Sequence, residues 1–105
     1  MNNKELLELA AKAVNQPIEF TDGVPVSFIE NGVVFAAWNP LNDDGDALRL
    51  AVKLLLDVTF SETHAFAFPP EMQDGCFELI NVGDPYAATR RAIVRAAAEI
   101  GKAML

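Results

Sequence analysis

One short turn constrains the fold of this chain more than any other segment. Asn31-Gly32 separates two apolar runs, residues 26–30 and 33–38, and this dipeptide is the strongest local signal for a two-residue β-hairpin turn. The register set by such a turn pairs Glu30 with Val33, Phe28 with Phe35 and Val26 with Ala37. Apolar side chains then lie on both faces of the hairpin, and both faces need a covering layer. The sequence therefore predicts a three-layer α/β/α sandwich.

The remaining segments complete an α/β (α+β) pattern within one domain, residues 1–105. Helices that each begin after an Asn or Asp N-cap are predicted over 2–14, 43–55 and 85–103, and further strands over 18–21, 57–68 and 76–82. Residues 57–68 alternate in polarity for longer than one ordinary strand, so one bent strand and a hairpin both remain open. The predicted order is α-β-β-β-α-β-β-α, with a mostly antiparallel sheet of about four to five strands.

The composition limits the partners that the chain can bind. Apolar residues make up 51% of the chain, and its net charge of −7 comes from scattered carboxylates. Nucleic-acid backbones and anionic membranes attract proteins rich in Lys and Arg, so neither is an expected partner of this acidic protein. Cys76 is the only cysteine, which excludes an intramolecular disulfide, and together with the lack of a signal-peptide pattern it favours a soluble cytoplasmic protein.

The densest group of oxygen ligands in the chain is Asn42-Asp43-Asp44-Gly45-Asp46. These side chains suit calcium or magnesium, but the spacing does not match the EF-hand loop, because Ala51 stands where that loop requires a bidentate glutamate. Helix capping explains the cluster better, with Asp43 as N-cap and the other carboxylates at the positive end of the helix dipole. No metal site and no cofactor are therefore expected.

The last predicted helix carries a cluster of three arginines, Arg90, Arg91 and Arg95. They could hold an anionic ligand, or they could form ion pairs with the acidic segment 42–46. The sole histidine, His64, and the sole cysteine both lie in predicted strands among phenylalanines, and no spacing joins them into a catalytic set. A glycine-rich phosphate loop is also missing from the sequence. The sequence therefore predicts a protein that is not an enzyme.

Two long segments resemble a known family, and a third shorter one agrees with them. They are WNPLNDDGDALRLAVKL at 38–54, DPYAATRRAIVRAAAEIGKAM at 84–104 and MNNKELLELAAKA at the N-terminus. In this order they resemble the bacteriophage ABA-sandwich domain family of small phage and prophage proteins. The resemblance implies α/β/α layering and a location in the bacterial host cytoplasm. It implies no activity and supplies no catalytic residues, and residues 56–82 carry little of it.

Two functional hypotheses follow. The first is a non-enzymatic phage or prophage accessory protein of unknown function, which acts by self-association, as a homodimer or other homo-oligomer, or by contact with a host or phage protein. The apolar surface of the helix over 43–55 motivates it, because that surface exceeds what one sheet face can cover. The alternative is a protein that binds or sequesters a small anionic ligand or nucleotide. The residues predicted to bind such a ligand are Trp38, Asp44, Asp46, Tyr86, Arg90 and Arg91.

Overall fold

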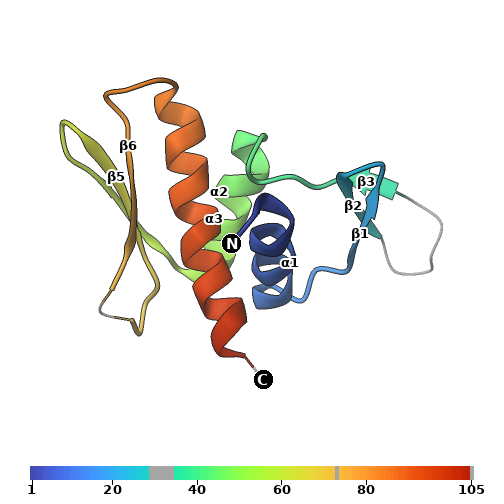
Figure 1. Ribbon diagram of the computed structural model, residues 1–105. Helices are drawn as coiled ribbons and strands as arrows, with labels where there is room; N and C mark the ends of the chain where they lie inside the picture. Colours follow the sequence, from blue (N-terminus) through green and yellow to red (C-terminus); the bar gives the residue numbers. More distant parts are fainter. Residues whose placement is uncertain (29–34, 73, 105) are drawn as a thin grey trace.

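Three helices lie between two small antiparallel sheets in the computed structural model of the chain, which describes residues 1–28, 35–72 and 74–104 (Figure 1). The elements are α1 Asn3–Ala13, β1 Ile18–Thr21, β2 Val24–Phe28, β3 Phe35–Ala37, α2 Asp44–Leu54, β4 Asp57–Phe60, β5 His64–Phe68, β6 Cys76–Leu79 and α3 Pro85–Ala103. This is the mixed α+β content that the sequence predicts. No helix in the described ranges has both the length and the apolar character needed to cross a membrane.

The three predicted helices are present, and each begins at the predicted cap. The side-chain oxygen of Asn2 accepts the backbone N–H of Glu5 at 2.8 Å at the start of α1. Asp43 does the same for Asp46 at 2.8 Å in α2, and Asp84 accepts from Tyr86 at 2.9 Å in α3. Each cap pairs a backbone N–H that would otherwise have no partner within its helix, which explains why the helices begin at these residues.

The first sheet has the strand order β1-β2-β3 and contains the predicted hairpin register. Val26 pairs with Ala37 and Phe28 pairs with Phe35, as the two-residue turn predicts. The predicted turn and the pair Glu30 with Val33 fall outside the described residues. This sheet lies beside α1 at one end of the molecule, and the ammonium of Lys4 lies 5.5 Å from the centre of the Phe20 ring (Figure 1).

The second sheet has the order β4-β5-β6 and decides the open question about residues 57–68. These residues form a hairpin, because Asp57–Phe60 pairs antiparallel with His64–Phe68 and the Ser61 N–H donates to the His64 carbonyl at 2.9 Å. The strand predicted over 76–82 ends at Leu79 and pairs with β5. The observed order is therefore α-β-β-β-α-β-β-β-α, with one strand more than the minimum predicted.

The sheet organisation differs from the prediction. The sequence predicts one sheet of about four to five strands, whereas the described residues form two sheets of three strands each, with helices between them. The α/β/α layering is therefore not confirmed. The alternation along a strand shows which faces are apolar, but it does not show which other strand will pair with it. Here α2 follows β3 directly and separates the two groups of strands along the chain.

The core lies mainly between α1 and α3, at a contact that we call the seam. Its members on α3 are Ala97, Ala98 and Gly101, and Ala10 faces them from α1; all four are buried. A Cβ atom at Gly101 would collide with the carbonyl of Leu9. Ala97 and Ala98 lie four and three positions before Gly101 on α3, so these small residues share a helix face and allow the two backbones to approach closely.

Candidate binding groove

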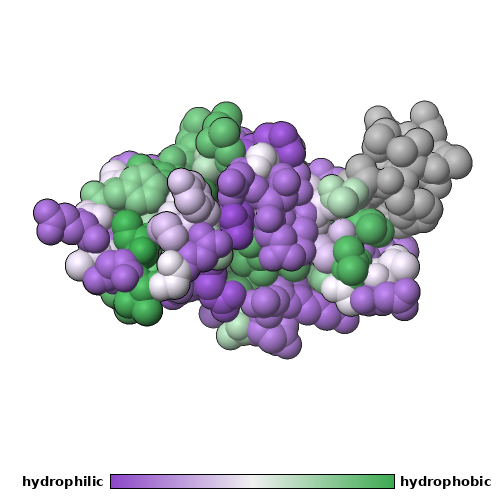
Figure 2. Space-filling view, turned by 90° about the horizontal axis from the view of Figure 1, so that it is seen from above, coloured by the Kyte–Doolittle hydropathy of each residue, from purple (hydrophilic) through white to green (hydrophobic). Residues whose placement is uncertain are grey.

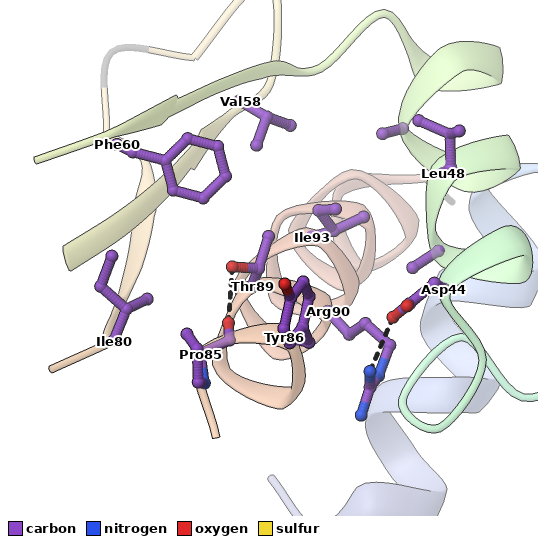
Figure 3. A pocket seen from close by; sticks show the side chains of 12 residues that line it. Asp44, Leu48, Val58, Phe60, Ile80, Pro85, Tyr86, Thr89, Arg90 and Ile93 are labelled. Atoms are coloured by element: carbon purple, nitrogen blue, oxygen red, sulfur yellow. Dashed lines mark hydrogen bonds and ion pairs between the residues drawn. The ribbon is translucent and has the colours of Figure 1, made fainter. Parts of the chain in front are cut away.

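An apolar groove of about 590 Å³ lies between α2, α3 and the β4–β6 sheet. Figure 3 shows Leu48 from α2, Val58 and Phe60 from β4 and Ile93 from α3 directed toward one hollow. Ala47, Ala51 and Ile93 are buried in the lining, whereas Leu48, Phe60 and Tyr86 are 63%, 61% and 69% exposed. We call this site the groove, with the three buried residues as its base and the three exposed residues as its rim.

The groove exists because the apolar surface of α2 divides into two parts. Ala47, Leu50 and Ala51 are buried against the core. Leu48 and Val52, which lie on one face of α2 at i and i+4, are exposed, and so is Leu55, which directly follows the helix; we call these three residues the α2 stripe. In the described residues the sheet ends at β4, which pairs only with β5, so no further strand covers this stripe.

An ion pair closes the polar end of the groove. The Arg90 guanidinium donates to the Asp44 carboxylate at 2.7 Å through Nη1 and to the Leu41 carbonyl at 2.8 Å through Nε. The Arg90 side chain is only 16% exposed, whereas that of Asp44 is 71% exposed. Thr89, the other hydroxyl-bearing residue here besides Tyr86, donates to the Pro85 carbonyl at 2.8 Å. The charges in the lining are therefore paired with each other, which leaves an apolar binding surface.

Three of the six predicted ligand-binding residues come together in the groove. Asp44, Tyr86 and Arg90 all line it, which brings the acidic segment 42–46 next to the arginine-bearing helix. The ion pair between the acidic segment and the arginine helix is also present, since Arg90 binds Asp44.

The other three predicted residues do not line the groove. Asp46 accepts the Asn39 backbone N–H at 3.0 Å and pairs with Arg49 at 2.7 Å. Arg91 points to α1, where its Nη1 donates to the Asn3 side chain at 2.9 Å. Trp38 is half-buried against the core. These positions follow from local geometry: on a helix, Arg90 and Arg91 point about 100° apart, so only one of them can face α2.

Sequence reasoning missed most of the apolar residues of the groove. Leu48 carried a signal, because the helix over 43–55 has more apolar residues than one covered face needs. Val58, Phe60 and Ile80 carried none, since they look like ordinary strand residues and reach the groove only through the pairing of β4, β5 and β6. An apolar residue at a sheet edge cannot be told from a central one by its own alternation.

His64 and Cys76 lie on opposite faces of the second sheet. His64 pairs with Leu79, and Nδ1 of its ring is 2.7 Å from the Thr63 hydroxyl. Cys76 is buried on the face toward α3 and pairs with Ala67. Burial raises the pKa of the Cys76 thiol, although the nearby Arg95 guanidinium partly offsets this effect. The two side chains therefore cannot form a nucleophile and base, and the raised pKa keeps the thiol protonated.

Comparison with protein-family models, with curated proteins and with solved structures yields no match to this chain. Within the described residues, no group of three or more His, Cys, Asp or Glu side chains is placed to hold a metal ion. The carboxylates of Asp43 and Asp46 already serve the α2 cap and the Arg49 ion pairs. We therefore take the groove as the candidate functional site of this protein.

Proposed function

We propose that this protein is a non-enzymatic interaction protein whose groove receives apolar side chains of a protein partner. The observation that carries the proposal is the exposed rim of Leu48, Phe60 and Tyr86 around a buried apolar base. Covering one large apolar side chain contributes roughly 1.5–3 kcal/mol, so three such residues around a hollow favour a partner that presents apolar side chains.

The groove suits a protein partner better than a small anion. An anionic ligand or nucleotide, the alternative hypothesis, would have to displace the Asp44 carboxylate from Arg90 or approach a helix end already occupied by Asp84. Either route costs an existing charge-assisted interaction. Millimolar nucleotides should therefore leave the melting temperature unchanged, whereas a rise of several degrees would favour the alternative.

The resemblance to the phage family supports the biological setting of this proposal. The two segments that carry it, 38–54 and 84–104, contain α2 and α3, which form two walls of the groove. A phage or prophage accessory protein in the bacterial cytoplasm would meet a host or phage protein as its partner. We also propose the α/β/α layering of that family for this chain. A strand added next to β4 would extend the sheet and cover the α2 stripe.

The test is capture of partners by the tagged chain and by two variants from a bacterial lysate that also contains the untagged chain, so that a second copy counts among the possible partners. Leu48→Glu places a charge on the rim of the groove, and Val24→Glu places the same charge on β2, where Val24 is 53% exposed. Both changes affect exposed residues and should alter the free energy of unfolding by about 0.5 kcal/mol or less. We expect the wild type and Val24→Glu to retain the same proteins and Leu48→Glu to lose them.

The proposal fails if Leu48→Glu captures the same proteins in the same amounts as the wild type. Urea unfolding of all three proteins must accompany the capture, so that a loss of binding is not a loss of fold. Tyr86→Glu provides a second rim variant on a different helix, and its capture should match that of Leu48→Glu.

A further inference from the structure

We infer that the partner of the groove is a second copy of this chain, and that the two copies form a two-fold symmetric dimer with their grooves facing each other. This inference rests on the proposed function, because it names the partner of the same site. Self-complementary shape, an open strand edge, paired charges and sufficient apolar area each support it.

The groove offers both the projections and the hollows that a symmetric interface needs. A two-fold interface brings the same surface patch of each copy together, so the patch must be complementary to itself. Leu48 and Phe60 project from the rim, while Ala47 and Ala51 leave space at the base. A rim residue of one copy can therefore enter the base of the other, and the reverse contact follows by symmetry.

The edge of β4 beside the groove is open and can pair with its own copy. The Ser61 N–H donates to the His64 carbonyl, so the register makes Thr59 with Phe66 the next bonded pair along the hairpin. The backbone groups of Val58 and Phe60 then point away from β5, toward the free edge. A two-fold axis perpendicular to the sheet relates two such edges in antiparallel orientation, which is the orientation that a β-ladder accepts.

The charges near the groove do not oppose this contact. Asp44 is neutralised by Arg90, and Arg49 on the same helix is paired with Asp43 and Asp46. If Val58 of one copy pairs with Phe60 of the other, Asp57 faces Ser61 and no two carboxylates of β4 lie opposite each other. Two copies still repel each other through their net charge of −7 each, but this long-range repulsion is screened by salt.

The exposed apolar area suits a reversible dimer. The rim together with the α2 stripe comprises five exposed side chains, Leu48, Val52, Leu55, Phe60 and Tyr86. They offer on the order of 500 Å² per copy, given that a fully covered aromatic side chain buries roughly 150–250 Å². The edge of β4 and the lining beneath add to this, toward the roughly 800 Å² per partner of a standard interface. We therefore expect a dimer with a dissociation constant in about the micromolar range.

A second exposed apolar surface provides the matched control. Hydrophobic residues gather at the end of the molecule that holds β4, β5 and β6 (Figure 2). On the face of this sheet away from α3, the Phe66 ring lies 6.1 Å from Phe68 and 6.2 Å from Phe77. Phe77 is 55% exposed. Phe77 lies on β6, which is also an edge strand, but these rings do not line the groove. We therefore place the dimer interface at the groove, where a hollow lies beside an open edge.

Sedimentation equilibrium of the full chain over about 1–200 µM tests the inference, because this range brackets a micromolar constant. We expect a dimer for the wild type and for Phe77→Glu, and at least tenfold weaker association for Leu48→Glu. We also expect the dissociation constant of the wild-type dimer to fall as NaCl is raised from about 50 to 500 mM, since salt screens the repulsion between the copies.

Three results would overturn the inference: a wild-type monomer at the highest concentration, a dimer unchanged by Leu48→Glu, or a dimer lost only in Phe77→Glu. The last result would place the interface on the aromatic face. A second rim variant, Tyr86→Glu, guards against misfolding of Leu48→Glu. A monomer that still captures a protein in a Leu48-dependent manner would end this inference and leave the proposed function intact. If Leu48→Glu weakens neither the dimer nor the capture of partners, both this inference and the proposed function fail.

Discussion

The helix α3 meets its neighbours in two contrasting ways. On the α1 side, at the seam, small residues pack fully buried against each other and Gly101 lies against the Leu9 carbonyl. On the other side, at the groove, large side chains such as Leu48 and Tyr86 stand exposed around a hollow. The seam is closely packed without large residues, and the groove is open despite having them. The seam therefore contributes to the stability of the fold, whereas the side chains around the groove are left uncovered.

The largest expected effect comes from one substitution made on the two sides of α2. Leu50→Ala removes a core side chain that is only 3% exposed, and should lower the free energy of unfolding by about 3 kcal/mol. Leu48→Ala, on the groove side, should lower it by less than about 0.5 kcal/mol. Urea unfolding measures both. Equal losses would show that the groove side of α2 is as well packed as the core side.

The second comparison uses one glycine at the seam and one near the start of α2, next to the groove lining. Gly101→Ala should lower the free energy of unfolding by about 2 kcal/mol, because the new Cβ atom would force α1 and α3 apart at Leu9. Gly45→Ala, near the start of α2, meets only the flexible Arg49 side chain and the Asp43 carboxylate, at 3.2 Å each. It should be neutral or stabilise by up to about 1 kcal/mol, since alanine favours the helix. A stabilising Gly101→Ala would mean that the seam is less tight than described.

The third comparison separates the two interactions of Arg90. Arg90→Ala should lower the free energy of unfolding by about 2 kcal/mol, because the Leu41 carbonyl loses a charged donor at a partly buried position. Asp44→Asn should lower it by less than about 0.5 kcal/mol, because the Asp44 carboxylate is largely solvent-exposed. If Asp44→Asn proved the more costly change, the ion pair and not the backbone contact would hold the groove's polar end.

The fourth prediction concerns the end of α2. Leu55 has a left-handed backbone with φ of 56°, and its side chain is 75% exposed. Leu55→Gly should raise the free energy of unfolding by about 1 kcal/mol, because glycine adopts this conformation without strain and little buried contact is lost. The same variant should weaken the proposed dimer, which uses Leu55. Thermal unfolding at a concentration below dimer formation measures the first effect, and a lower melting temperature would contradict it.

The smallest effect is a pH dependence at Cys76. Its raised pKa means that the folded chain keeps the thiol proton after the unfolded chain has lost it. Stability from this group is therefore complete below the ordinary value of 9.0 and declines as pH rises above it. Urea unfolding of the wild type and of Cys76→Ala from about pH 8 to about pH 10 isolates the effect, because the other titrating groups are common to both. Parallel pH profiles would show that the thiol is not desolvated.

Much of the local structure could be predicted from the sequence. The caps at Asn2, Asp43 and Asp84 depend on side-chain oxygens within three residues of their N–H donors, so short-range geometry suffices to find them. The register that pairs Phe28 with Phe35 is the one that a two-residue turn at Asn31-Gly32 predicts. The meeting of segments 38–54 and 84–104 was also anticipated, since an acidic helix start and a row of arginines favour each other.

The division into two sheets and the shape of the groove were not predictable in this way. Contacts between residues far apart in the sequence decide whether β4 pairs with β3 or has an unpaired edge. The alternation of polar and apolar residues within each strand is the same in both cases. Phe60 illustrates the difficulty. Its place in the strand pattern shows the face on which it lies, but it is exposed beside α2 because, among the described residues, β4 pairs only with β5.

The sequence by itself therefore determined the helices, the register between β2 and β3 and the faces that are apolar, because these depend on contacts between residues close along the chain. The tertiary structure alone decided which apolar faces are covered. At the seam, Gly101 and its alanine neighbours let two helices close over each other. At the groove, the described strands end at β4, and Leu48, Phe60 and Tyr86 are left exposed around the hollow, where a partner would bury them.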